Sequence, residues 1–445
     1  MRRLNIRVRS FSSISASVPP LATAASASWT ALGVPSFLLG KLSRMGIGSP
    51  TSVQAAALPA LLRDLTRPVP DTVIHSETGS GKTLTYLLPL LARLAPSTAP
   101  TARLRAIICV PTRELAHQVA AVAESLGEVG RGKDATRALR VLKVVGEVSA
   151  QTLFGLKESP PHIIVGTPHT LMRLIPTHVN TGELCALILD EADELLRVHN
   201  IAAVRTLAAH VRGHKARPGV VCVSATSSFG LEKFTREAPR ASSALAFDLT
   251  NGSPRTPKTL RHTLVRITRP NAAFNTFTRL LAALRPMAVL SFHNSAAGLE
   301  ALEVHLRERG VRCGVLGAAY GGEQRAKALG ALATGRASVL LATEMAARGL
   351  DIPRLSHVIN FDPPSSLREY IHRAGRVGRL SSTSPGRAGT VVNFAYDEKS
   401  VADITELART LGVDLDELQF EAGEPIVTRI LEAPHSASAI IREES

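Results

Sequence analysis

Short apolar runs alternate with longer stretches of helical periodicity along most of the chain. The runs cover residues 106–110, 141–145, 162–165, 186–189 and 220–223 in the first half, and residues 262–267, 288–292, 311–316, 338–342, 357–360 and 390–394 in the second half. Nearly continuous runs of Val, Ile and Leu are typical of parallel strands that are buried on both faces. The pattern predicts an α/β protein with two successive domains, each a parallel sheet with helices on both faces.

Changes in composition set the expected domain boundaries. We place the first domain at residues 36–247 and the second at residues 262–412, because the polar, turn-rich residues 248–261 read as a linker. Residues 413–445 hold eight acidic residues against Arg429 and Arg442, so we expect an acidic C-terminal tail. Such a tail repels phosphate and is a poor RNA anchor.

The first 35 residues are interpreted as a targeting segment outside the fold. They are rich in Arg, Ser and Ala, and Asp64 is the first acidic residue of the chain. This composition suits an organelle transit peptide, and residues 9–12, Arg-Ser-Phe-Ser, resemble a mitochondrial processing site. We expect a mitochondrial location, with chloroplast and a merely disordered basic tail as alternatives.

The charge balance points to a polyanionic partner. The net charge of +15 comes from 52 basic and 37 acidic residues, although seven of the basic residues lie in the acid-free residues 1–63. No run of 18 apolar residues occurs, so no membrane span is expected. The four cysteines, Cys109, Cys185, Cys222 and Cys313, are widely spaced and read as buried thiols in a reducing compartment.

A glycine-rich loop between a predicted strand and a predicted helix is the first candidate binding site, and its ligand would be a phosphate chain. Gly79 and Gly81 allow backbone N–H groups to face a phosphate chain, and a helix N-terminus lies behind them. In the P-loop pattern Lys82 reaches the β- and γ-phosphates and the Thr83 hydroxyl ligates Mg²⁺. The expected set for ATP is Ser76, Glu77, Thr78, Gly79, Ser80, Gly81, Lys82 and Thr83. The alternative is a glycine-rich turn that caps an ordinary helix.

Polar stretches follow the other predicted strands of the first domain, and ligands of parallel sheets bind at the carboxyl ends of strands. They are residues 111–116, 167–168, 190–193 and 224–226. Adjacent acids after a buried strand can serve ATP hydrolysis, Asp190 toward Mg²⁺ and Glu191 toward the attacking water. The alternative is a helix whose first turn is acidic to suit its dipole.

Two further segments carry candidate nucleotide contacts. Gln54 opens a predicted helix, and its amide can pair with an adenine edge, although an ordinary surface glutamine is the alternative. Residues 348–351 and 370–379 of the second domain place several arginines beside glycines, as arginine fingers require. A basic patch for nucleic acid is the alternative for these arginines.

Together these segments resemble the DEAD-box ATP-dependent RNA helicases over residues 36–400. The resemblance implies two tandem RecA-like domains, with ATP in the cleft between them and RNA across both. It implies that Phe37 packs on adenine, that Gln54 bonds its edge and that Asp351 reaches the ribose. The implied catalytic residues are Lys82, Asp190, Glu191, Arg376 and Arg379. The implied RNA contacts are Arg113, Thr167, Arg325 and Thr343. The implied coupling residues are Ser224 and Thr226, which would link the nucleotide state to closure of the two domains, and His372, which would join the ATP and RNA sites.

Several motifs depart from the family pattern, mostly on the RNA side. The family's Thr-Pro-Gly-Arg reads Thr-Pro-His-Thr at residues 167–170, its Gly-Gly reads Gly146-Glu147, and its Thr-Asp reads Thr343-Glu344. Ser76 stands where the P-loop usually has Gly or Ala. We therefore expect weaker RNA binding by the first domain than is usual for the family.

The resemblance leads to a functional hypothesis with two alternatives. The chain is expected to bind the RNA backbone and to use ATP to separate short duplexes or to remodel RNA–protein complexes, with a protein partner that supplies specificity. The first alternative is an ATP-gated RNA clamp or ribosome-assembly factor with little unwinding activity, and a DNA translocase is the second.

Overall fold

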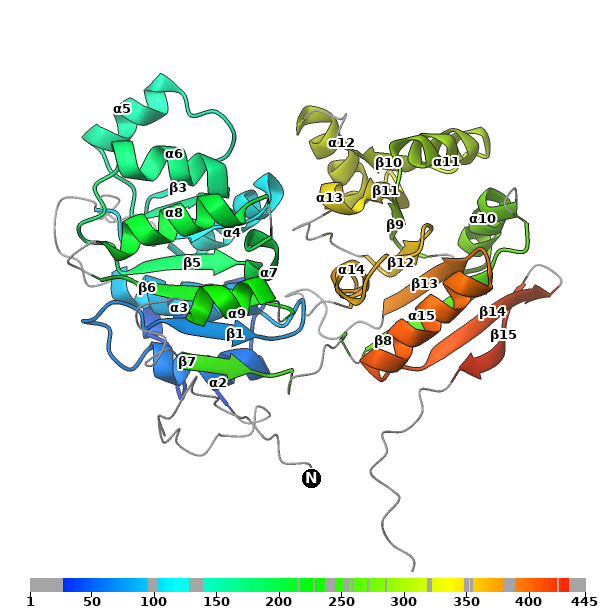
Figure 1. Cartoon of the computed structure of the whole chain (residues 1–445), viewed down its shortest axis with the longest axis horizontal. Helices are drawn as coiled ribbons and strands as arrows, with labels where there is room; N and C mark the ends of the chain where they lie inside the picture. Colours follow the sequence, from blue (N-terminus) through cyan, green and yellow to red (C-terminus); the bar gives the residue numbers. More distant parts are fainter. Residues whose placement is uncertain are drawn as a thin grey trace, which may run out of the picture. The chain divides into compact units, whose positions relative to one another are not determined.

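The computed structural model divides into two compact units between Gly252 and Ser253, inside the predicted linker (Figure 1). The structure describes residues 27–94, 103–127, 139–197, 199–213, 217–226, 229–236, 245–250, 256–257, 259–269, 272–284, 286–317, 322–347, 352, 355–378, 389–421 and 424–431. Residues 1–26, which hold most of the predicted targeting segment, and the candidate residues Asp351 and Arg379 lie outside this set.

The first unit is a seven-stranded sheet in which every neighbouring pair is parallel. Its order is β3-β4-β2-β5-β6-β1-β7. The strands are β1 (Thr72–His75), β2 (Ala106–Cys109), β3 (Val141–Val144), β4 (Ile163–Gly166), β5 (Ala186–Asp190), β6 (Gly219–Ser224) and β7 (Leu245–Asp248). The helices are α1 (Ser36–Arg44), α2 (Ser52–Leu61), α3 (Lys82–Leu94), α4 (Arg113–Gly127), α5 (Ala150–Glu158), α6 (Pro168–His178), α7 (Ala192–Leu195), α8 (Ile201–Arg212) and α9 (Phe229–Arg236).

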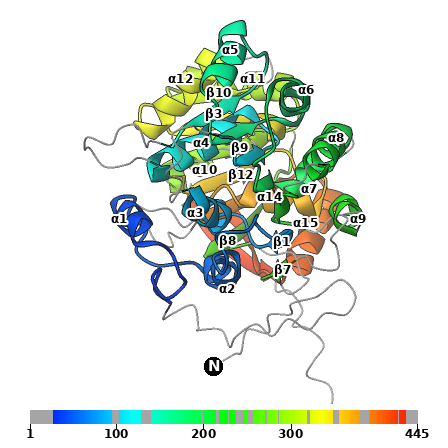
Figure 2. The same ribbon diagram turned by 90° about the vertical axis from the view of Figure 1, so that its left-hand side faces the viewer.

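Successive strand residues of the first unit face two separate cores. Ile108 and Ile188 pack with α2, α3 and α4, and α2 lies beside α3 (Figure 2). Their neighbours Ile107 and Leu187 pack on the opposite face with α6, α8 and α9. Because side chains alternate along a strand, a strand buried on both faces must be apolar throughout. The predicted parallel sheet covered on both faces is confirmed.

The fold of the first unit begins before residue 36, where we expected it to start. Trp29, Leu32 and Val34 are each at most 6% exposed and join the core of α1 and α2. The Trp29 indole N–H donates to the Ile47 carbonyl at 3.3 Å. Residues 27–35 are therefore part of the folded unit, which corrects the boundary of the predicted targeting segment.

The second unit is an eight-stranded sheet of order β10-β11-β9-β12-β13-β8-β14-β15. Its strands are β8 (Leu260–Arg266), β9 (Val289–His293), β10 (Cys313–Leu316), β11 (Val339–Thr343), β12 (His357–Asn360), β13 (Gly389–Ala395), β14 (Leu415–Glu421) and β15 (Glu424–Leu431). Its helices are α10 (Ala273–Leu284), α11 (Ala296–Glu308), α12 (Gly322–Ala333), α13 (Glu344–Ala347), α14 (Leu367–Ala374) and α15 (Glu398–Leu411). α12 and α14 pack on one face, and α10 and α11 pack on the other.

The second unit continues past residue 412, where we expected the acidic tail to begin, because residues 415–421 and 424–431 add two strands to the sheet. β14 pairs parallel with β8, and β15 then pairs antiparallel with β14. Leu415 is fully buried and Leu418 is 7% exposed, while Glu417 binds Arg266 at 2.7 Å. The polar residues between these apolar positions obscured the strand in the sequence. The linker is likewise shorter than predicted, since Asp248 ends β7 and Leu260 begins β8.

Within the described residues no helix is long and apolar enough to cross a membrane.

Candidate functional site

Two groups of predicted site residues lie along one edge of the first sheet, at the carboxyl ends of its strands. The nucleotide group follows the adjacent strands β5, β6 and β1, and the RNA group follows the adjacent strands β3, β4 and β2. The backbone N–H of Ser76, after β1, donates to the carbonyl of Ser224, at the end of β6, at 3.2 Å. The sheet order thus brings together segments that lie up to 150 residues apart in the chain.

The loop between β1 and α3 has the backbone that phosphate binding requires. Gly79 and Gly81 have φ angles of 76° and 88°, in the left-handed region that favours glycine. A Cβ on Gly81 would lie 2.4 Å from the Gln54 side-chain nitrogen, so a larger residue is excluded there on two grounds. α3 begins at Lys82, which places the positive end of the helix dipole behind the loop.

Lys82 lies inside the loop. Its Nζ atom donates to the carbonyls of Ser76 and Glu77 at 2.7 and 2.6 Å. Ser76 is 3% exposed and its hydroxyl donates to Ser80 Oγ, so the unusual Ser76 is accommodated as a loop-stabilising residue. The ammonium is held where a bound phosphate chain would meet it.

Gln54 links α2 to the phosphate-binding loop. Its side-chain carbonyl accepts from the Thr51 N–H at 2.8 Å, and its amide nitrogen donates to the Gly81 carbonyl at 3.0 Å. Gln54 is 1% exposed, which rules out the surface-residue alternative. Phe37 on α1 is 43% exposed, with the Lys41 ammonium 5.7 Å from its ring centre. Adenine recognition by Phe37 and Gln54 stays a prediction.

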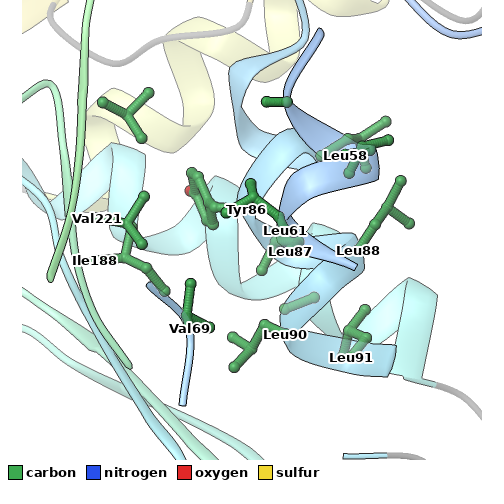
Figure 3. Packing of buried hydrophobic residues seen from close by; sticks show 14 of the residues in the cluster. Leu58, Leu61, Val69, Tyr86, Leu87, Leu88, Leu90, Leu91, Ile188 and Val221 are labelled. Atoms are coloured by element: carbon green, nitrogen blue, oxygen red, sulfur yellow. The ribbon is translucent and has the colours of Figure 1, made fainter. Parts of the chain in front are cut away.

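Asp190 ends β5 in a buried, polar environment. It is 4% exposed; its Oδ2 atom accepts from the Tyr86 hydroxyl at 2.8 Å and its Oδ1 atom from the Glu191 N–H at 2.9 Å. Burial, together with the charge of Glu191, raises the pKa of Asp190 to about 6. The Tyr86 ring lies in the same buried apolar cluster as Leu61, Ile188 and Val221 (Figure 3).

The residues around Asp190 fit a hard divalent cation. A buried carboxylate with a raised pKa is stabilised in its ionised form by a nearby cation, and carboxylate and hydroxyl oxygens are ligands that Mg²⁺ accepts. Thr83 supplies a hydroxyl in the first turn of α3, the helix that also carries Tyr86. Asp190 and Thr83 are therefore suited to hold Mg²⁺ together with the phosphates.

Glu191 has a left-handed backbone, with φ 52° and ψ 50°. Glutamate rarely adopts this conformation, which costs on the order of 1 kcal/mol or more and persists where the surroundings impose it. The strand ends at Asp190, and the sharp turn at Glu191 directs the chain into α7. Since α7 begins only at Ala192, Glu191 precedes that helix and is not part of its acidic first turn.

The coupling residues Ser224 and Thr226 contact the same acidic segment through Asp193, which the sequence analysis did not select. The Thr226 hydroxyl donates to Asp193 Oδ2, and the Ser224 hydroxyl donates to the Thr226 carbonyl at 2.6 Å. Asp193 is 1% exposed. Its spacing of three residues from Asp190, across the start of a helix, was the signal available in the sequence.

The RNA group of the first unit lies after β2, β3 and β4. Arg113 begins α4, and its guanidinium would lie 3.2 Å from a Cβ added to Gly146, whose φ is 77°. Thr167 caps α6, and its hydroxyl lies 3.2 Å from that of Thr170, which also donates to the Gly146 carbonyl at 3.2 Å. Arg113 and Thr170 thus both lie beside Gly146, and Thr167 contacts Thr170.

Thr170 has a structural task at the position where the family has arginine. It is 3% exposed and its hydroxyl ties α6 to the turn after β3. His169 is exposed and contacts the His199 carbonyl at 3.2 Å. An arginine at position 170 would replace a buried hydrogen-bonded hydroxyl, so the departure from the family pattern is built into the packing.

The described candidates of the second unit lie on β11, on α12, on α14 and just after α14. Thr343 ends β11, and Arg325 on α12 donates to the Ala346 carbonyl of α13 at 2.9 Å. His372 and Arg376 are 8% and 5% exposed, and Arg376 Nε donates to the His372 carbonyl at 3.2 Å. Their roles toward RNA and the γ-phosphate stay predictions.

Known families match both units. Residues 51–234 match the DEAD/DEAH box helicase family, and residues 272–381 match the helicase conserved C-terminal domain. The chain belongs to the DEAD-box helicase family. The ATP-dependent RNA helicase DbpA of Bacillus subtilis is 28% identical over 404 residues, which are 88% of this chain and 76% of that protein. The DEAD-box ATP-dependent RNA helicase CshC of Bacillus cereus is 26% identical over 395 residues, which are 88% of this chain and 94% of that protein.

The fold of this DEAD-box helicase also resembles a solved structure of the family. Dbp5 of S. cerevisiae, bound to RNA and ADP BeF3, superposes with a TM-score of 0.74 at 24% identity, over 88% of this chain and 95% of Dbp5. The likeness confirms two tandem RecA-like domains. In this DEAD-box helicase the nucleotide group keeps the residue types that its chemistry needs, while the RNA group of the first unit carries the altered positions Glu147, His169 and Thr170.

Proposed function

We propose that this DEAD-box protein is an RNA-stimulated ATPase that separates short RNA duplexes or remodels RNA–protein complexes. The observation that carries the proposal is the convergence of the phosphate loop, the Asp190–Glu191 pair and the Ser224–Thr226 segment at the ends of three adjacent strands. Lys82 and the loop amides bind the phosphates, and Glu191 accepts a proton from the attacking water. Magnesium, held by Asp190 and Thr83, would neutralise charge on the phosphates.

Hydrogen bonds connect the three segments of the nucleotide group with one another. A change at the phosphate loop passes to Ser224 through its backbone bond with Ser76, and on to Asp193 through Thr226. Arg113 and Thr167 on the first unit, with Arg325 and Thr343 on the second, would hold the RNA backbone with little sequence preference. Arg376, which follows α14, would complete the ATPase, so hydrolysis would depend on both units.

The first test is steady-state ATP hydrolysis by the full chain with and without single-stranded RNA. We expect strong stimulation by RNA, weaker stimulation by matched DNA, and a loss of turnover on the order of 10²- to 10⁴-fold in Glu191→Gln with nucleotide binding retained. This control removes the base while it keeps size and hydrogen bonding. Equal turnover in Glu191→Gln, or equal stimulation by DNA, would contradict the proposal.

A second candidate function is an ATP-gated RNA clamp with little unwinding. The buried Thr170 and the carboxylate of Glu147 favour it, because both replace residues that approach RNA in the family. Glu147→Gly restores the family residue without a change in the buried core. If this variant binds RNA more tightly and unwinds a short duplex faster, the native chain is tuned toward clamping; unchanged binding counts against the clamp.

We also propose a mitochondrial location and a protein partner that selects the RNA. Support for the location is the acid-free, Arg- and Ser-rich composition of residues 1–26. A fluorescent protein fused to residues 1–35 tests the proposed location. Import into mitochondria supports the proposal, and import into plastids or a diffuse signal contradicts it.

A further inference from the structure

A buried chain of polar side chains lies behind α14, the helix that carries His372 and leads to Arg376. Its members come from α14, from the three strands β8, β12 and β13, and from Thr256, which precedes β8 in the second unit. They are Arg373, Asn360, Asn393, Tyr370, His262 and Thr256, and none is more than 5% exposed. Buried polar groups are costly unless they are hydrogen-bonded, so their partners are informative.

The first half of the chain has a fixed hydrogen-bond direction. Arg373 can only donate, and its Nη1 atom donates to Asn360 Oδ1 at 3.3 Å. The amide nitrogen of Asn360 must therefore face Asn393, and it donates to Asn393 Oδ1 at 2.7 Å. The Asn393 amide then donates to the Thr263 carbonyl at 2.9 Å and to the Tyr370 hydroxyl at 3.4 Å.

The second half selects one tautomer of His262. Tyr370 accepts from Asn393, so its hydroxyl proton is available for His262 Nδ1, which lies 2.7 Å away. Nδ1 is then the acceptor, and the ring proton sits on Nε2, which faces the Thr256 hydroxyl at 3.3 Å. The opposite tautomer would leave the proton of the fully buried Tyr370 hydroxyl without an acceptor.

Arg373 fixes α14 at the other end of the chain. Its guanidinium is fully buried, donates to the Asp362 carbonyl and the Asn294 side chain at 2.8 and 2.9 Å, and pairs with Glu369. All of these bonds come from one guanidinium, so a rotation or slide of α14 would break them together. The loss would be costly, because a buried charge needs its partners. Tyr370 and Arg373 lie one turn apart, so the two contacts set both the tilt and the register of the helix.

We propose that His262 is a positioning residue for the ATPase reaction: by accepting from Tyr370 it ties β8 to α14 and holds His372 and Arg376 in place. This inference rests on the proposed function, because Arg376 serves it only if the chain hydrolyses ATP. Thr256, which precedes β8 near the start of the second unit, extends the chain through its contact with His262 Nε2 at 3.3 Å.

The test compares His262→Leu with His262→Gln in the full-length protein. Leucine has a similar volume and no acceptor, whereas the glutamine amide can accept from Tyr370 and donate to Thr256. Well below the unfolding temperature we expect kcat of RNA-stimulated hydrolysis to fall at least tenfold in His262→Leu, with the Kd for ATP within twofold, and to stay within threefold of the parent in His262→Gln. Tyr370→Phe should match His262→Leu, and the double variant should be no worse.

A second readout does not depend on catalysis. Amide hydrogen exchange of residues 367–376 should accelerate in His262→Leu and remain parental in His262→Gln, even if the parent protein shows no RNA-stimulated hydrolysis. An inactive parent would overturn the proposed function alone. Parental kcat and exchange in His262→Leu, or equal defects in the leucine and glutamine variants, would overturn the positioning role.

Discussion

Burial acts in opposite directions on two titratable side chains of this protein, and in both cases it favours the neutral form. Desolvation raises the pKa of Asp190 to about 6 and lowers the pKa of His262 to about 4. The surroundings differ, however. Neutral His262 has a donor on one side and an acceptor on the other, so its charged form gains nothing. Asp190 ends a strand at the sheet edge where ligands bind, and a cation there reverses the effect of burial.

The pKa of His262 makes stability depend on pH. The unfolded chain takes up a proton near pH 6.5 and the folded chain only near pH 4, so the contribution of His262 is complete above pH 6.5 and is lost as pH falls toward 4. The loss between pH 7 and pH 5 is about 2 kcal/mol. Urea unfolding of the parent and of His262→Gln at both pH values measures it. A glutamine variant that loses as much stability as the parent would refute the assignment.

At the scale of elements, one glutamine connects a helix start to a functional loop. Gln54 caps α2 through the Thr51 N–H and holds the Gly81 carbonyl of the phosphate loop. Because α2 also packs beside α3, the loop is bounded by two helices whose relative position Gln54 helps to set. The helix cap and the nucleotide site therefore share a single side chain.

Two substitutions separate these tasks. Gln54→Glu keeps an acceptor for the Thr51 N–H but loses the donor to Gly81, whereas Gln54→Ala loses both. We expect Gln54→Ala to lower the free energy of unfolding by about 1–2 kcal/mol, in line with the loss of a cap, while Gln54→Glu loses less. Both should weaken ATP binding. Thermal unfolding with and without ATP checks this; intact nucleotide affinity in Gln54→Glu would show that the Gly81 contact is dispensable.

The sequence predicted elements well where one physical signal dominated. The apolar runs identified the strands buried on both faces, and the glycine positions identified the phosphate loop. β14 was missed because Asp416 and Glu417 separate its buried Leu415 and Leu418. Spacing alone could not separate Arg373 from Arg376, because the distinction depends on partners from distant segments, such as Asn360 on β12 and Asn294 just after β9.

At the scale of the whole molecule, each unit is completed by residues outside the motif-bearing region. Residues 27–35 cover the core beside α1 in the first unit, and β14 and β15 extend the sheet of the second. β14 covers the edge of β8, the strand that carries His262, and Glu417 neutralises Arg266 there. The ends of the folded region therefore protect sheet edges and cores that the catalytic motifs depend on.

Truncation measures the contribution of β14. A chain that ends at residue 412 loses the burial of Leu415 and Leu418, worth about 3–6 kcal/mol together, and exposes the edge of β8. A chain that ends at residue 431 keeps both strands and is the matched control. We expect the shorter chain to unfold at a lower temperature and to aggregate, and the longer one to behave as the parent. Equal melting curves would show that β14 is dispensable.

The position of Lys82 has a consequence for how nucleotides enter the site. Its ammonium group is bound by the carbonyls of Ser76 and Glu77, so the loop supplies its own competitor for the phosphate. Binding is then an exchange of ligands and not a simple addition. A polyphosphate, with several negative charges, replaces two neutral carbonyls at a net gain, whereas a nucleoside without phosphate offers the lysine nothing. An incoming ligand therefore needs enough negative charge to displace the two loop carbonyls from the Lys82 ammonium.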